Sequence, residues 1–277
     1  MPPTITSEPP AAAALEDAPP QQEQDPVTPA GPPASGSRGP RARLVVRAVL
    51  LMLIAGMVAF EVNIDTGPNV ATAPALVAAI DQARHSTPVM IAPNERIAMA
   101  LVASEDSGFY SNDGIDILAM ARALAGFLTG TDTGGSTIEM QLAHMLYPAA
   151  TAGFWGRVHR VSLALQFDAH YTKEAILSMY LDAAYFGHGY YGIREAAAGY
   201  FGVEPGQLTW PQAALLAGLV QAPTSLDPFV HIGAAERRMG YVLQRLASDG
   251  VLTSAQATAM LESPLGLVAV PAPAGPL

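Results

Sequence analysis

The sequence predicts an all-α protein, and three kinds of observation support this fold class. From residue 75 onward, apolar side chains recur at the three- and four-residue spacing of an amphipathic helix, and no strand-like alternation of useful length appears. Serine or threonine stands at the start of several segments, where it can cap a helix. Glycine and proline separate the segments. The expected helices are 75–84, 94–104, 115–128, 136–147, 157–170, 173–183, 190–201, 208–221, 233–248 and 253–261.

Four segments begin with a specific capping signal. Ser136 is followed three residues later by Glu139, which is the spacing of a capping box. Thr172, Thr209 and Thr253 each stand immediately before a helical segment. These residues are therefore predicted to satisfy backbone N–H groups at the starts of four helices.

The N-terminal 43 residues predict a disordered cytoplasmic tail. Residues 1–37 are rich in proline, alanine and glutamine and contain five acidic residues and no basic one. Such a stretch cannot bury enough apolar surface to offset the chain entropy that folding would cost.

Residues 44–62 are predicted to form a transmembrane signal-anchor helix. Arg38, Arg41, Arg43 and Arg47 lie at its N-terminal side, and acidic residues follow the apolar run. Because basic residues favour the cytoplasmic side, this asymmetry places the N-terminus inside and the rest of the chain outside the cytoplasmic (inner) membrane, as a single-pass protein. A buried core helix is the alternative interpretation.

The remaining chain is predicted to form a folded domain at 63–263 and a flexible tail at 264–277. Its composition excludes several classes of function. Fourteen basic residues against 24 acidic ones give a net charge of −10, which argues against nucleic-acid binding. The absence of cysteine excludes disulfides and thiol nucleophiles. No cluster of Asp, Glu and His has ligand spacing, so no dedicated metal site is predicted.

The segment 104–110, Ser-Glu-Asp-Ser-Gly-Phe-Tyr, combines acidic and aromatic side chains at the end of an apolar run. Glu105 is expected to lie at the end of a helix packed on the core. A carboxylate in such a place suits a general base that takes a hydroxyl proton. Taken alone, a Glu-Asp pair of this kind is more often solvated or capping.

The segment 134–142, Gly-Gly-Ser-Thr-Ile-Glu-Met-Gln-Leu, is a glycine-rich turn that leads into a helix. Backbone N–H groups at a helix N-terminus can hold a pyrophosphate, helped by the helix dipole. Glu139 is better interpreted here as the return half of the capping box with Ser136 than as a catalyst.

Together these two segments resemble the first two motifs of the family 51 glycosyltransferases, the peptidoglycan transglycosylases. The segment 180–193 is similar to a further motif of the family, and the resemblance covers about residues 70–262. With no transpeptidase domain following, the chain looks like the monofunctional biosynthetic type, related to the transglycosylase domain of bifunctional penicillin-binding proteins. The resemblance implies Glu105 as the catalytic base. It implies a substrate-binding role for Asp106, Phe109, Gly135, Ser136, Thr137 and Gln141.

The chain departs from the family at its third motif, where the second catalytic carboxylate is expected. Arg160 stands at that position, and residues 140–167 contain no Asp or Glu. Arg157 lies three residues earlier on the same helical face. The two arginines could form a cationic pocket that binds the donor pyrophosphate. A solvent-facing basic turn is the alternative.

The resemblance implies a lysozyme-like helical fold with a small lobe, about residues 107–135, against the membrane. It implies a peptidoglycan glycosyltransferase that polymerises lipid II, with the cytoplasmic membrane and other cell-wall synthesis proteins as partners. The substrate pyrophosphate could bring a divalent cation. Two other classes stay open: an impaired family member that binds lipid II or a cell-wall synthesis partner without efficient turnover, and a glycoside-cleaving enzyme.

Overall fold

The computed structural model describes Leu51, residues 69–116 and residues 135–268. In this part of the chain no β-strand occurs apart from one isolated bridge between Tyr185 and Tyr191, so the all-α prediction is confirmed there. No helix in these ranges has the length and apolar character needed to span a membrane. The tail 1–43 and the anchor 44–62, except Leu51, lie outside the described residues.

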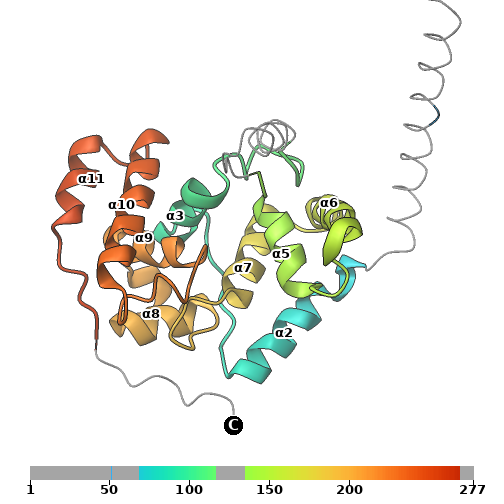
Figure 1. Cartoon of the computed structure of the whole chain (residues 1–277), viewed down its shortest axis with the longest axis horizontal. Helices are drawn as coiled ribbons and strands as arrows, with labels where there is room; N and C mark the ends of the chain where they lie inside the picture. Colours follow the sequence, from blue (N-terminus) through green and yellow to red (C-terminus); the bar gives the residue numbers. More distant parts are fainter. Residues whose placement is uncertain (1–50, 52–68, 117–134, 269–277) are drawn as a thin grey trace, which may run out of the picture. The chain divides into compact units, whose positions relative to one another are not determined.

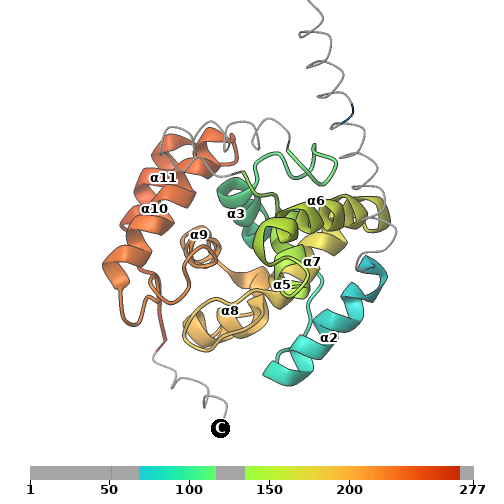
Figure 2. The same cartoon turned by 45° about the vertical axis from the view of Figure 1, so that its right-hand side comes forward.

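One group of helices packs around a central apolar helix. This helix is α9 (Trp210–Leu219), in which every residue from Ala213 to Leu219 is buried. A helix that is apolar on all sides needs neighbours on all sides. Figures 1 and 2 show α9 surrounded by α3 (Arg96–Glu105), α8 (Ile193–Phe201) and α10 (Ile232–Ser248), with α11 (Ser254–Leu261) beside α10.

A second group of helices forms the other side of the same unit. In it α5 (Ile138–Leu146) packs against α6 (Gly153–His170) and α7 (Lys173–Ala183). Helix α2 (Ala73–Arg84) lies against α7, as Figure 1 shows. The short 3-10 helices η1 (Val70–Thr72) and η2 (Pro205–Gln207) complete the order.

The threonine caps are confirmed, whereas the predicted capping box at Ser136 is wrong. Thr172, Thr209 and Thr253 are N-caps whose side chains accept backbone N–H groups. The cap of α5 is instead Thr137, which accepts from Met140 N, one residue later than predicted. The physical reason is tertiary, because the Thr137 hydroxyl also donates to the carbonyl of Gly114 at 2.8 Å.

Two predicted segments differ from the structure. Ile115 and Asp116 are not helical, and the rest of the expected helix 115–128 lies outside the described residues. Of the expected flexible tail 264–277, residues 264–268 are held against the core. Their backbone exchanges hydrogen bonds with α8 and α9: Val268 N donates to Tyr200 O, and Gln212 Nε2 donates to Leu265 O.

Candidate active site

Glu105, the last residue of α3, lies where the two helix groups meet. Its Oε2 accepts a hydrogen bond from Gln141 Nε2 of α5 at 3.1 Å. Its Oε1 accepts one from Arg238 Nη2 of α10 at 3.2 Å. The Glu105 side chain is 12% exposed, so both contacts form largely out of water. Each carboxylate oxygen of Glu105 therefore has a hydrogen-bond donor.

A buried tyrosine fixes the orientation of Gln141. Tyr180, on α7, donates its hydroxyl to Gln141 Oε1 at 2.8 Å. Burial, and in second place the negative charge of Glu105, raise the pKa of Tyr180 well above its usual value. The hydroxyl therefore stays protonated and acts as a donor throughout the physiological pH range.

Arg238 is itself held by neighbouring elements. Its guanidinium lies over the ring of Tyr241, one helical turn away, at 4.7 Å from the ring centroid. Gly218 of α9 leaves room for the arginine stem, since a Cβ at this position would lie only 2.8 Å from Arg238 Cγ. The α9–α10 crossing thus sets where the arginine head can reach.

Asp106 accepts hydrogen bonds from groups other than those that bind Glu105. It accepts from Asn112 Nδ2 at 3.1 Å and from the backbone N–H of Ile138 at 3.3 Å. Burial raises its pKa, although the hydrogen bonds from Ile138 and Asn112 oppose the shift. The substrate-binding role of Asp106 stays a prediction. Its hydrogen bonds join the segment after α3 to the start of α5.

Lys173, at the start of α7, joins several elements beneath the site. Its Nζ lies 2.7 Å from both Glu139 Oε1 and Asp168 Oδ1, and it donates to Asn112 Oδ1 at 3.2 Å. Burial alone would lower the pKa of Lys173, but the hydrogen bonds to Asp168 and Glu139 outweigh it and the pKa is raised. Glu139 is fully buried and takes no part in a capping box.

The other predicted binding residues differ in how they could reach a substrate. Phe109 is fully buried, with Lys173 Nζ 4.9 Å from its ring centroid. Thr137 is buried by its cap and by its bond to Gly114, whereas Gly135 and Ser136 are partly exposed. Gln141 binds Glu105 itself. The turn before α5 is therefore accessible at its glycine and serine rather than at its threonine.

The two predicted cationic residues lie on α6, away from the direct partners of Glu105. Arg157 is exposed and Arg160 is partly buried. The Nε atom of Arg160 is buried without a hydrogen-bond partner in the described structure. The cation that contacts Glu105 is Arg238 rather than either of these residues.

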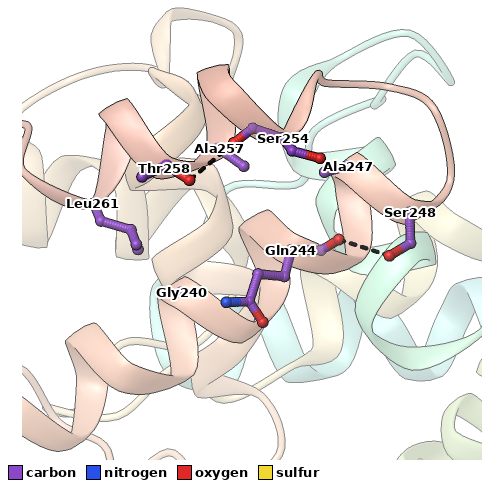
Figure 3. Close-up of a pocket in the computed structure, with 8 residues that line it drawn as sticks. All are labelled: Gly240, Gln244, Ala247, Ser248, Ser254, Ala257, Thr258 and Leu261. Atoms are coloured by element: carbon purple, nitrogen blue, oxygen red, sulfur yellow. Dashed lines mark hydrogen bonds between the residues drawn. The ribbon is translucent and has the colours of Figure 1, made fainter.

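A groove of about 350 Å³ lies between α10 and α11 (Figure 3), and it is separate from this site. Its lining carries no charged side chain. Ser248 and Thr258 turn their hydroxyls back onto their own helices, donating to Gln244 O and Ser254 O. Among the described residues, no group of three or more Asp, Glu and His side chains could hold a metal ion.

Comparison with protein families matches residues 74–247 to the family described as Transglycosylase. The chain belongs to this family. The resemblance of the Glu105 and Gly135 segments to family 51 transglycosylases is thereby confirmed.

Two relatives and one solved structure illustrate the extent of the similarity. A Cupriavidus necator protein, whose name assigns it provisionally to the transglycosylases, is 36% identical over 61% of this chain and 73% of its own. Penicillin-binding protein 2a of Streptococcus pneumoniae is 35% identical over 61% of this chain. The crystal structure of penicillin-binding protein 1A from Haemophilus influenzae aligns with 35% of this chain and 14% of its own, at 31% identity and a TM-score of 0.33. The match spans 23% of the pneumococcal protein's length.

Sequence reasoning did not place two members of this candidate site, Arg238 and Tyr180. Arg238 follows buried Ala235 by three residues and precedes buried Val242 by four, so helical spacing could have put it at the edge of the buried face. Tyr180 lies in a continuous buried run of α7. Its hydroxyl then needed a partner, as buried polar groups do. Neither pattern identifies Glu105 or Gln141 as that partner.

Proposed function

We propose that this transglycosylase is a peptidoglycan glycosyltransferase that polymerises lipid II, with Glu105 as its general base. The supporting observation is that Gln141 and Arg238 each donate to one oxygen of Glu105. The two donors hold both oxygens of the carboxylate in place, and a general base must be positioned to accept the hydroxyl proton.

In the proposed reaction the 4-hydroxyl of the acceptor sugar attacks the anomeric carbon of a second, lipid-linked sugar. The hydroxyl proton passes to Glu105 as the new C–O bond forms. The bond between the anomeric carbon and the pyrophosphate breaks, and the undecaprenyl pyrophosphate leaves with the electron pair. Arg157 and Arg160 of α6 are proposed to bind this anionic group, and Gly135 and Ser136 offer backbone N–H groups near the start of α5.

One observation favours a second candidate, a family member that binds lipid II or a cell-wall synthesis partner without efficient turnover. Residues 140–167 contain no acidic side chain. The two acids nearest Glu105 in the described network, Asp106 and Glu139, are both buried and engaged elsewhere. A second carboxylate facing the substrate is thus not supplied by either of them.

Polymerisation of fluorescent lipid II by the purified full-length protein, read on a gel, separates these functions. Glu105→Gln keeps the side-chain shape but removes the base, so we expect the rate to fall by about 10²–10⁴ with the fold intact. Glu236→Gln, a neutralisation at an exposed position of α10, is the matched control and should retain the wild-type rate. If neither the wild type nor the Glu105→Gln variant makes polymer while both bind lipid II, the binding function is correct.

A further inference from the structure

We infer that Tyr180 is a positioning residue: by donating to Gln141 Oε1, it holds the amide in place with its N–H against Glu105 and keeps the carboxylate ready to accept a proton. The inference deepens the proposed function and rests on it for its catalytic consequence. Two hydrogen bonds define the relay, Tyr180 Oη to Gln141 Oε1 at 2.8 Å and Gln141 Nε2 to Glu105 Oε2 at 3.1 Å.

Arg238 sets the direction of this relay. An arginine is a permanent cation and only a donor, so the Glu105 oxygen that it contacts must accept. A carboxylate next to Gln141 requires the amide N–H on its side, which leaves the amide oxygen facing Tyr180. The tyrosine hydroxyl must then donate. An inverted amide would place its oxygen against the carboxylate and lose the hydrogen bond to Glu105, although the Tyr180 hydroxyl could then accept from the amide N–H.

Tyr180 is well suited to hold that direction. It is 1% exposed, and all its neighbours in α7 from Ile176 to Ala183 are buried, so the ring has little freedom to turn. Burial raises its pKa far above neutrality, so the hydroxyl keeps the proton that it donates to Gln141 at working pH. A buried polar group of this kind rigidifies its partners when its hydrogen bond is made.

Removal of the hydroxyl should therefore change the ionisation behaviour of the site rather than its shape. In Tyr180→Phe the amide oxygen of Gln141 loses its buried donor, so the amide is free to turn or move away from Glu105, and a carboxylate that has lost this N–H favours its protonated form. We expect the acid limb of the kcat/KM–pH profile to move upward by about 0.5–1 pH unit, which is the size expected for loss of one hydrogen bond. The rate on the acid limb should fall about three- to tenfold, and the rate on the alkaline side should stay near that of wild type.

Two comparisons separate this role from ordinary packing. Tyr200→Phe is the matched control, since Tyr200 is also fully buried but donates to the carbonyl of Phe186, away from Glu105. It should leave the acid limb in place. In a double-mutant cycle, Tyr180→Phe added to Gln141→Leu should cause no further displacement, because the residue through which it acts is already gone.

A titration independent of turnover distinguishes failure of this inference from failure of the proposed function. With ¹³C-glutamate labelling of the full-length protein, NMR can follow the carboxyl signal assigned to Glu105 by its loss in Glu105→Gln. The midpoint should rise in Tyr180→Phe and not in Tyr200→Phe, even if no polymer is made. An unchanged midpoint in Tyr180→Phe, or equal displacement in both tyrosine variants, would overturn the positioning role while leaving polymerisation unaffected.

Discussion

Three acidic residues near the candidate site differ in their burial and in their hydrogen-bond partners: Glu105, Asp106 and Glu139. Glu139 is fully buried against Lys173, and Asp106 accepts from Asn112 and a backbone N–H. Only Glu105 keeps part of its surface accessible while both oxygens are held by side-chain donors. Asp106 and Glu139 therefore differ from Glu105 in being buried and held by other groups.

Arg160 tests whether the arginines of α6 serve an anionic ligand. Arg160→Ala removes a charge and the buried Nε that has no partner in the described structure. Charge-assisted hydrogen bonds contribute roughly 1.5–3 kcal/mol, so lipid II binding should weaken about ten- to a hundredfold. Fluorescence titration at one fixed salt concentration measures this. Arg84→Ala, which removes an arginine stacked on Tyr191 at the end of α2, should bind as wild type. Equal binding by the Arg160 and Arg84 variants would show that Arg160 does not contribute to lipid II binding.

At the scale of elements, the α9–α10 crossing controls the arginine that contacts Glu105. Gly218→Ala adds a methyl group 2.8 Å from Arg238 Cγ, which must move aside. Alanine favours the helix by up to about 1 kcal/mol over glycine, and this gain opposes the cost of moving the arginine stem. The free energy of unfolding should therefore change little. Displacement of a catalytic contact costs much more in rate, and we expect polymerisation to fall about tenfold.

Gly240→Ala is the control for that substitution. Gly240 also lies within a helix, but its added methyl would meet the Cδ2 atom of Leu261 at 3.1 Å, on the α11 side. The tip of a leucine can shift, so this variant should keep both rate and contact. Both variants are compared with wild type by their thermal unfolding midpoint and their polymerisation rate, and only Gly218→Ala should lose rate. Similar rates for the two variants would contradict a role for the crossing in placing Arg238.

Helices and their threonine caps could be predicted because they depend on short-range pattern. Thr172, Thr209 and Thr253 were found from the residues that follow them. The N-cap of α5 was missed by one residue, because Thr137 bonds a carbonyl 23 residues away and Glu139 bonds a lysine 34 residues away. A capping box read from neighbouring residues cannot anticipate competition of this kind.

At the scale of the whole described unit, the site is a junction of elements that are distant in the chain. The Arg238–Glu105 contact joins residues 133 positions apart, and the Tyr180–Gln141 contact joins residues 39 apart. The family resemblance predicted Glu105 as the base and Gln141 as a substrate-binding residue, and the structure brings these two residues into contact. The partners of Glu105 could not be identified from pattern, since pairing across helices depends on how α3, α5, α7 and α10 pack.

A second junction, between α2 and α7, makes the stability of the whole unit depend on pH. Asp182 accepts from Val89 N at 3.1 Å. Burial raises its pKa to about 7, and the nearby charge of Asp81 adds to the shift. The pKa of an aspartate in an unfolded chain is about 4. Between about pH 4 and 7 the folded state therefore binds a proton that the unfolded state does not, and this contribution to stability is lost as the pH rises.

Asp182→Asn should remove that dependence, because the amide keeps an oxygen for Val89 N and carries no charge. The variant should match wild type in stability near about pH 4 and exceed it at about pH 8, by on the order of 3–4 kcal/mol for a shift of this size. Urea unfolding of both proteins at several pH values across this range measures the two slopes. Asp249→Asn neutralises an aspartate at the end of α10, 3.9 Å from Arg245 and 30% exposed, and should keep the wild-type slope. Parallel curves for Asp182→Asn and wild type would show that Asp182 is ionised in the folded protein across this range, and that the pH dependence arises at another residue.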